Sequence, residues 1–110
     1  MDTRTMLKGE VKAQIGAFRA ALKDDSGEKI ESLINEALDI EFTRSFNGEF
    51  RGFSLTLCLG GPNVYLTHHV SQSEAFVEGY WAGDSVKIHL GIVESDILWD
   101  YMEELVDCMK

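Results

Sequence analysis

Apolar residues recur with helical spacing in three stretches of the chain, residues 4–24, 27–38 and 95–109. Within each stretch they stand three or four positions apart, so they fall on one face of a helix with 3.6 residues per turn. We therefore predict three amphipathic helices. The apolar positions of the first helix are Leu7, Val11, Ile15, Phe18 and Leu22, and those of the last are Leu98, Met102, Leu105 and Met109.

Polar residues mark where the second and third helices begin. Asp25, followed three positions later by Glu28, resembles an N-terminal capping pair, in which side chains accept hydrogen bonds from free backbone N–H groups. Ser95 stands at the start of the last periodic stretch, and serine is a common N-cap because its hydroxyl accepts such a bond. We expect these two residue sets to start the two helices.

Between the second and third helices the period changes to two, which is typical of strands with one buried face. Ile40, Phe42 and Phe46 alternate with polar residues, and the same alternation returns over residues 53–59. An Asn-Gly pair between these runs favours a hairpin, because both residues tolerate a positive φ. Three further strands are predicted at residues 63–70, 74–81 and 85–90. Their connections are short enough only for hairpins.

These elements predict an α+β fold. It consists of an antiparallel β-meander of about five strands with two N-terminal helices and one C-terminal helix, in the order ααβββββα. The chain of 110 residues is within the size of one domain, so we assign residues 1–110 to a single domain. Three amphipathic helices are available to cover the apolar face of the sheet.

Residues 58–70, "CLGGPNVYLTHHV", combine two glycines with a proline and two histidines, as phosphate loops and metal sites do. A Walker-type loop would end in Lys-Ser or Lys-Thr and open into a helix, whereas this one opens into a strand. Pro62 and Asn63 suit the centre of a tight turn. His68 and His69 point to opposite faces of a strand, and no paired Cys or His spacing supplies further ligands. We predict a structural turn, with no metal and no cofactor.

No spacing organises a nucleophile, since neither G-x-S-x-G nor C-x-x-C occurs, and we predict no catalytic residues. Cys58 and Cys108 lie in apolar settings and are expected to be reduced, a disulfide between them being the alternative. No apolar stretch reaches the ~18 residues of a membrane span, and the first residues lack the apolar core of a signal peptide. We expect a cytoplasmic location.

The chain carries 19 acidic and 10 basic residues, a net charge of −9, which disfavours direct binding to nucleic acid or anionic lipid. Residues 52–110 hold only two of the bases. In the last helix the carboxylates form a row about 200° from the apolar stripe, so the other face is almost purely anionic. The row consists of Asp96, Asp100, Glu103 and Asp107, with Glu94 and Glu104 beside it. Either it keeps the protein dissolved or, because lysines are lacking, it docks on a basic partner.

A second candidate binding site is "EGYWAGD", residues 78–84. Tyr80 and Trp81 face opposite sides of a strand, so one of them is expected on the outer face of the sheet beside a hairpin. Glu78 and Asp84 flank them, and exposed aromatic residues near acids are common binding anchors. The alternative is that a helix covers both rings.

The runs "GGPNVYL" and "EGYWAGDSVKIHL", followed by an acidic terminal helix, resemble a group of small acidic proteins of phages and conjugative elements. The resemblance covers about the last half of the chain. Proteins of that size, charge and genomic setting include inhibitors of host defence nucleases, such as anti-CRISPR proteins. The resemblance implies this context and carries over no catalytic residue.

We therefore expect a small acidic inhibitor, monomer or homodimer, that binds a basic nucleic-acid-handling protein such as a nuclease effector. One alternative is an immunity or antitoxin-like protein that masks a basic toxin nuclease. Another is a small ligand-binding domain, which would need a deep pocket with converging histidine and carboxylate groups.

Overall fold

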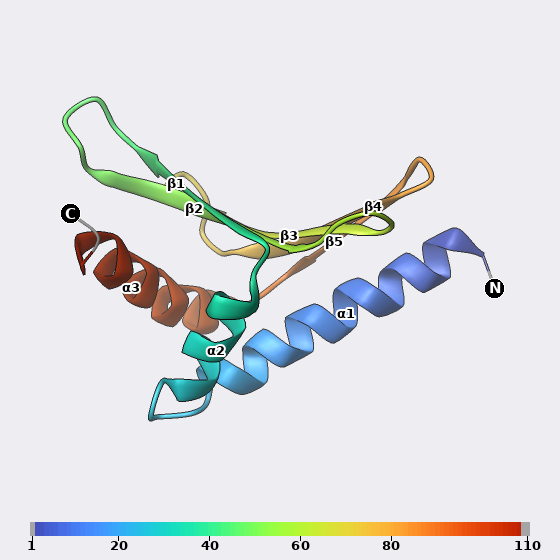
Figure 1. Ribbon diagram of the computed structural model, residues 1–110, viewed down its shortest axis with the longest axis horizontal. Coiled ribbons are helices and arrows are strands. Elements are labelled where there is room, and N and C mark those ends of the chain that lie inside the picture. Colours follow the sequence, from blue (N-terminus) through green and yellow to red (C-terminus); the bar gives the residue numbers. More distant parts are fainter. Residues whose placement is uncertain (1, 109–110) are drawn as a thin grey trace.

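The computed structural model of the protein describes residues 2–108 and confirms the predicted α+β order. The helices are α1 (Thr3–Leu22), α2 (Glu28–Glu36) and α3 (Ile92–Cys108). The strands are β1 (Asp39–Arg44), β2 (Phe50–Cys58), β3 (Asn63–His69), β4 (Phe76–Trp81) and β5 (Asp84–His89). The strands form one antiparallel sheet in sequence order, and all three helices lie on the same side of it (Figure 1). In the described part of the chain, the other face of the sheet carries no helix.

The alternation of side chains decides which face the helices cover. In β3, Val64 and Leu66 are fully buried under the helices, whereas Tyr65 and Thr67 on the other face are half-buried. One covered face and one open face are what an antiparallel meander with a period of two requires.

Helix α1 packs directly on the backbone of β4 at Gly79. A Cβ atom at this position would lie 2.7 Å from the Val11 Cγ2 atom and 2.8 Å from the Leu7 Cδ1 atom. Both of these side chains are fully buried. A side chain at residue 79 would therefore displace the helix from the sheet.

Two arginines of α1 bind the carbonyl groups of β5, which is one edge of the sheet. The Arg19 guanidinium donates to the His89 carbonyl at 2.9 Å and to the Leu90 carbonyl at 3.2 Å. Arg4 donates to the Ser85 carbonyl at 3.5 Å. The helix therefore covers part of this edge as well as the apolar face.

The prediction that Ser95 caps α3 is wrong, because the helix begins three residues earlier, at Ile92. Ser95 is instead fully buried, and its hydroxyl accepts a hydrogen bond from the Ala75 N–H at 2.8 Å. The bond ties α3 to the start of β4. The buried positions of the helix are Ser95, Leu98, Met102 and Val106, and the predicted Met109 lies outside the described residues.

The predicted capping pair of α2 is also wrong. Gly27, with φ +76°, is the N-cap and has no side chain to accept a bond. The Ser26 hydroxyl accepts a hydrogen bond from the Glu28 N–H at 3.2 Å and donates one to the Asp24 carboxylate at 2.7 Å. The capping oxygens therefore come from the residues on either side of Asp25.

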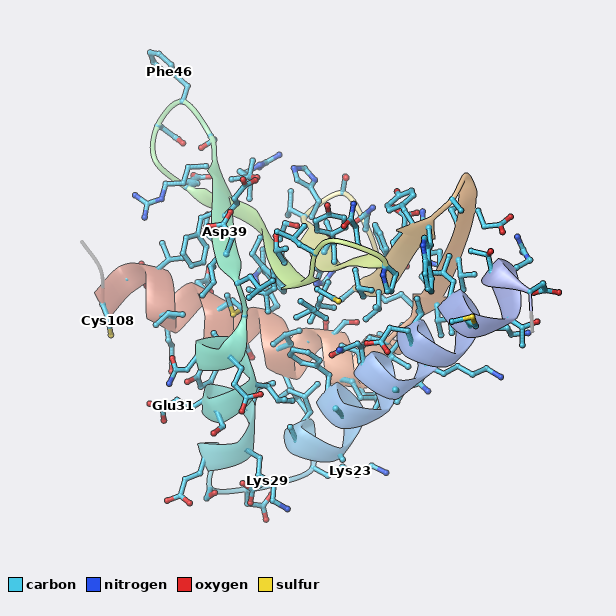
Figure 2. All side chains as sticks on the ribbon, turned by 45° about the vertical axis from the view of Figure 1, so that its right-hand side comes forward. Lys23, Lys29, Glu31, Asp39, Phe46 and Cys108 are labelled. Carbon is cyan, nitrogen blue, oxygen red and sulfur yellow. The ribbon has the colours of Figure 1, made fainter. Side chains whose placement is uncertain are left out.

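The first hairpin forms at the Asn-Gly pair, but its loop is longer than two residues. The Ser45 N–H donates to the Glu49 carbonyl at 2.9 Å, and Gly48 has φ +88°. A loop closed in this way contains three residues and ends in the left-handed conformation. Phe46 therefore lies in the loop, and the prediction that it belongs to a buried strand face is wrong. Its side chain is fully exposed and points away from the body of the protein (Figure 2).

The chain turns between β2 and β3, as predicted, but two glycines rather than Asn63 adopt the unusual φ values. Gly60 and Gly61 have φ values of +95° and +113°. Asn63 is the first residue of β3, and its side-chain oxygen accepts a hydrogen bond from the Gly60 N–H at 3.0 Å.

The two adjacent histidines face opposite sides of β3, as predicted. His68 is 5% exposed and packs edge-on against Trp99, with ring centroids 5.0 Å apart. Its Nε2–H donates to the Gln72 carbonyl at 3.2 Å, whereas its Nδ1 atom has no hydrogen-bond partner. Burial lowers the pKa of His68, and the carboxylates of Asp96 and Glu74 oppose this shift only in part.

Replacing Ser95 with alanine is expected to destabilise the fold. The substitution leaves the Ala75 N–H buried without an acceptor, which costs about 1–3 kcal/mol. Urea denaturation of Ser95→Ala should show this loss, with Ser73→Ala, an exposed position in the same region, as the control. Equal stability of the two variants would contradict the assigned hydrogen bond.

The stability of the protein should fall as the pH decreases below 6.5, the ordinary pKa of histidine. The unfolded chain takes up a proton on His68 at a higher pH than the folded chain does, so acid favours unfolding. Urea denaturation between about pH 7.5 and about pH 5.5 measures the effect. His68→Phe should remove this part of the pH dependence and His69→Gln should retain it. If both variants keep the full dependence, burial of His68 is not its source.

Candidate functional site

The carboxylates predicted to form a row are exposed on α3. Asp96, Asp100, Glu103, Glu104 and Asp107 all lie on the side of the helix that faces away from its buried residues. We call this side, together with the exposed apolar residues on it, the α3 outer face. Glu94 does not belong to it, because Glu94 is half-buried and its carboxylate folds back over Gly91.

Four carboxylates of the α3 outer face, those of Asp96, Asp100, Glu103 and Glu104, are not neutralised by the described bases of α1. Within residues 2–108 the single ion pair joins Lys87 to Glu78, so Asp96, Asp100, Glu103 and Glu104 take part in none. The two arginines of α1 that make long-range bonds use them on β5 carbonyls. The helix therefore presents negative charge to solvent.

The α3 outer face is not almost purely anionic, and this part of the sequence prediction is wrong. Ile92, Val93 and Ile97 are 58%, 67% and 47% exposed. Because α3 starts at Ile92, its first two turns bring these side chains beside the carboxylates. One signal for them was visible in the predicted helix, since Ile97 stands one position away from Leu98 and outside the predicted apolar stripe. An exposed apolar group with a charged border is the composition of a protein-binding surface.

A groove of about 340 Å³ lies at one side of the α3 outer face, between α3, the end of α1 and the start of α2. Ile30, Ile97 and Tyr101 are among its apolar walls, and Asp100 and Glu104 line it together with Asp24 and Asp25. Burial raises the pKa of Tyr101, and the carboxylates of Glu31 and Glu104 raise it further. Carboxylates from two segments, the α1–α2 connection and α3, therefore line a groove that has apolar walls. A lysine or arginine side chain, with its apolar stem and cationic head, matches this composition.

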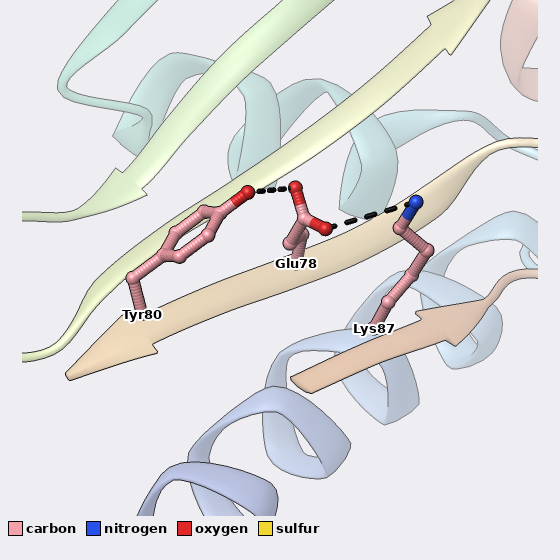
Figure 3. Close-up of polar contacts among 3 residues, drawn as sticks. All are labelled: Glu78, Tyr80 and Lys87. Atoms are coloured by element: carbon pink, nitrogen blue, oxygen red, sulfur yellow. Dashed lines mark hydrogen bonds and ion pairs between the residues drawn. The ribbon is translucent and has the colours of Figure 1, made fainter. Parts of the chain in front are cut away.

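The second candidate site is divided between the two faces of the sheet. Tyr80 is exposed on the open face and donates a hydrogen bond to the Glu78 carboxylate, which also pairs with the Lys87 ammonium at 3.7 Å (Figure 3). Trp81 is half-buried and packs against the core under the helices, and Asp84 is half-buried at the start of β5. The prediction that only one of the two rings faces outward is therefore confirmed.

The electrostatics of this second site differ from those of α3. The hydrogen bond to Glu78 is the main reason why the pKa of Tyr80 is raised. Lys87 also lies 4.3 Å from the centroid of the Phe76 ring. Glu78 therefore has both a hydrogen-bond donor and a cation, and it adds little to the negative surface.

A histidine and a carboxylate line the same hollow in more than one place. One hollow, of about 210 Å³, is lined by His68, Asp96 and Trp99, and it falls below the ≈ 300–1,000 Å³ of typical small-molecule sites. Another, of about 330 Å³, is lined by Glu74 and His89 together with Lys87, at the lower end of that range. Within the described residues no group of three or more His, Cys, Asp or Glu side chains is arranged to hold a metal ion. Cys58 and Cys108 are both free thiols.

None of the helices described for residues 2–108 has the length and apolar character of a membrane span. Comparison of the chain with protein-family models, with curated proteins and with solved structures finds no significant match. The residues of the α3 outer face and their surroundings are therefore the basis for a functional assignment.

Proposed function

We propose that the protein inhibits a basic nucleic-acid-handling protein by binding it through the α3 outer face. The observation that carries this proposal is the position of Ile92, Val93 and Ile97 next to Asp96 and Asp100, which form no ion pair within residues 2–108. A surface that only kept the protein dissolved would have charges without three exposed large apolar side chains. Apolar contact supplies affinity, and the surrounding charge supplies orientation and a fast encounter.

The regular row of carboxylates supports a partner that normally binds phosphates. Asp96, Asp100, Glu103 and Asp107 follow one another at about 4.5–6 Å along the helix axis, from a rise of 1.5 Å per residue. One DNA strand carries a negative charge about every 3.4 Å along its axis. A groove lined with lysine and arginine to hold such a strand would also attract this row, and the net charge of −9 adds long-range attraction.

The partner class that best fits these charges is a nuclease effector of host defence, which has a basic nucleic-acid channel. The same physical argument applies to a toxin nuclease, in which case the protein would act as an antitoxin. The two functions differ only in the partner. An inhibition assay with each type of nuclease separates them, since a true inhibitor blocks cleavage by one type at stoichiometric concentration.

Charge reversal on α3 tests the proposal. The variant Asp96→Lys/Asp100→Lys/Glu103→Lys should lose at least about tenfold in inhibition of the target nuclease, because it places cations against a basic surface. The control Glu28→Lys/Glu36→Lys/Asp39→Lys changes the net charge equally at exposed positions on α2 and β1. It should retain most of the inhibition. Equal losses in both variants would show that only total charge matters.

The apolar part of the surface is tested separately by Val93→Ser/Ile97→Ser. Both side chains are exposed, so the fold should persist, while affinity should fall about tenfold or more through faster dissociation. Raising the salt concentration should instead slow association of the unmodified protein. Binding that is indifferent both to salt and to these substitutions would refute the proposal.

A further inference from the structure

The two edges of the sheet are protected differently. At β5 the arginines of α1 occupy carbonyl groups, as described above. At the other edge, β1 pairs with β2 alone among residues 2–108, so its outward backbone groups are available to another strand. The irregularity in this pairing lies in β2, since Thr43 and Arg44 pair with Gly52 and Phe50 and leave Arg51 as the extra residue. Strand β1 itself therefore stays regular along its free edge.

Two large apolar side chains are exposed just beyond the ends of β1. Leu38, directly before the strand, is 61% exposed. Phe46, two residues after the strand, is fully exposed at the hairpin loop (Figure 2). Ile40 and Phe42, which lie between them, are only half-buried. The bare edge is therefore accompanied along its length by incompletely covered apolar side chains.

We propose that β1 pairs antiparallel with β1 of a second copy of this chain, with the two Phe42 residues opposite each other. In this register residue 41 of one copy lies opposite residue 43 of the other, and residue 40 opposite residue 44, so the numbers of each facing pair add up to 84. Leu38 of each copy then lies at the end of the strand pair where the hairpin loop of the other copy carries Phe46, so the exposed apolar residues are brought together at both ends. The contact uses the same surface on both copies, as a two-fold symmetric dimer requires.

The charges along β1 disfavour the registers centred on Glu41 and on Ile40. Pairing centred on Glu41 would place that carboxylate opposite its own copy, and pairing centred on Ile40 would place Asp39 opposite Glu41. Like charges directly opposite each other destabilise a strand pair. Centring on Phe42 places Glu41 opposite Thr43 instead, and no two acids meet.

Registers centred between two residues are disfavoured for a different reason. They turn the second sheet over, because a shift of one residue moves every side chain to the other face. Phe42, which faces the helical layer, would then lie opposite Glu41, and the two helical layers would lie on opposite sides. The register centred on Phe42 keeps both helical layers on one side and pairs aromatic with aromatic.

Substitutions at Thr43 test both the dimer and its register. Thr43 is exposed, so Thr43→Glu and Thr43→Lys should both fold, which far-UV circular dichroism checks. In the proposed dimer, residue 43 faces Glu41 of the second copy twice. Thr43→Glu should therefore weaken the dimer at least about tenfold relative to Thr43→Lys. Sedimentation velocity across a wide concentration range measures this, with dimer mass twice the 12.3 kDa of the chain.

A matched pair of controls separates register from overall charge. Ser32→Glu and Ser32→Lys alter the charge equally at an exposed position on α2, and they should dimerise alike. Phe46→Ser should weaken the dimer without loss of folding, because the Phe46 side chain is fully exposed within its own copy. A wild-type chain that stays monomeric at every concentration would overturn the proposal. Equal dimerisation of Thr43→Glu and Thr43→Lys would overturn the register.

Discussion

The contact between α1 and the backbone of β4 at Gly79 sets the distance between the helical layer and the sheet. Leu7 and Val11 are fully buried there, and a Cβ atom on Gly79 would overlap them. With α1 this close to the sheet, Arg19 reaches the carbonyl groups of β5. The rest of the apolar face is left for α2 and α3, so every helix lies on one side (Figure 1).

This one-sided arrangement gives the protein two unlike surfaces. On the open face of the sheet, Glu78 is engaged by Tyr80 and Lys87, so the local charge is largely balanced. On the helical side, α3 turns its buried residues to the sheet and its carboxylates to solvent. Binding surfaces of proteins commonly combine exposed apolar side chains with polar groups that are free to contact a partner. For this reason α3, rather than the open face, carries the functional proposal.

The helices and strands were predictable because the apolar residues that repeat along each of them are the same residues that become buried between the helices and the sheet. The order of helices and strands therefore follows from alternation alone. Positions where an element begins or ends depend on backbone geometry that periodicity does not contain. Phe46 keeps the alternation of its strand, yet the three-residue loop that ends at Gly48 takes it out of the sheet. Ser95 resembles an N-cap, but α3 starts at Ile92. The prediction therefore left Ile92 and Val93 outside the helix.

The arginines of α1 on β5 limit how copies of this protein can assemble. A sheet with two bare edges offers a new edge after every addition, and such growth leads to fibres. Here guanidinium groups already bind two carbonyls of the second edge, those of Ser85 and His89. Association through β1 uses the less protected edge of each chain, and this favours a closed pair over continued growth.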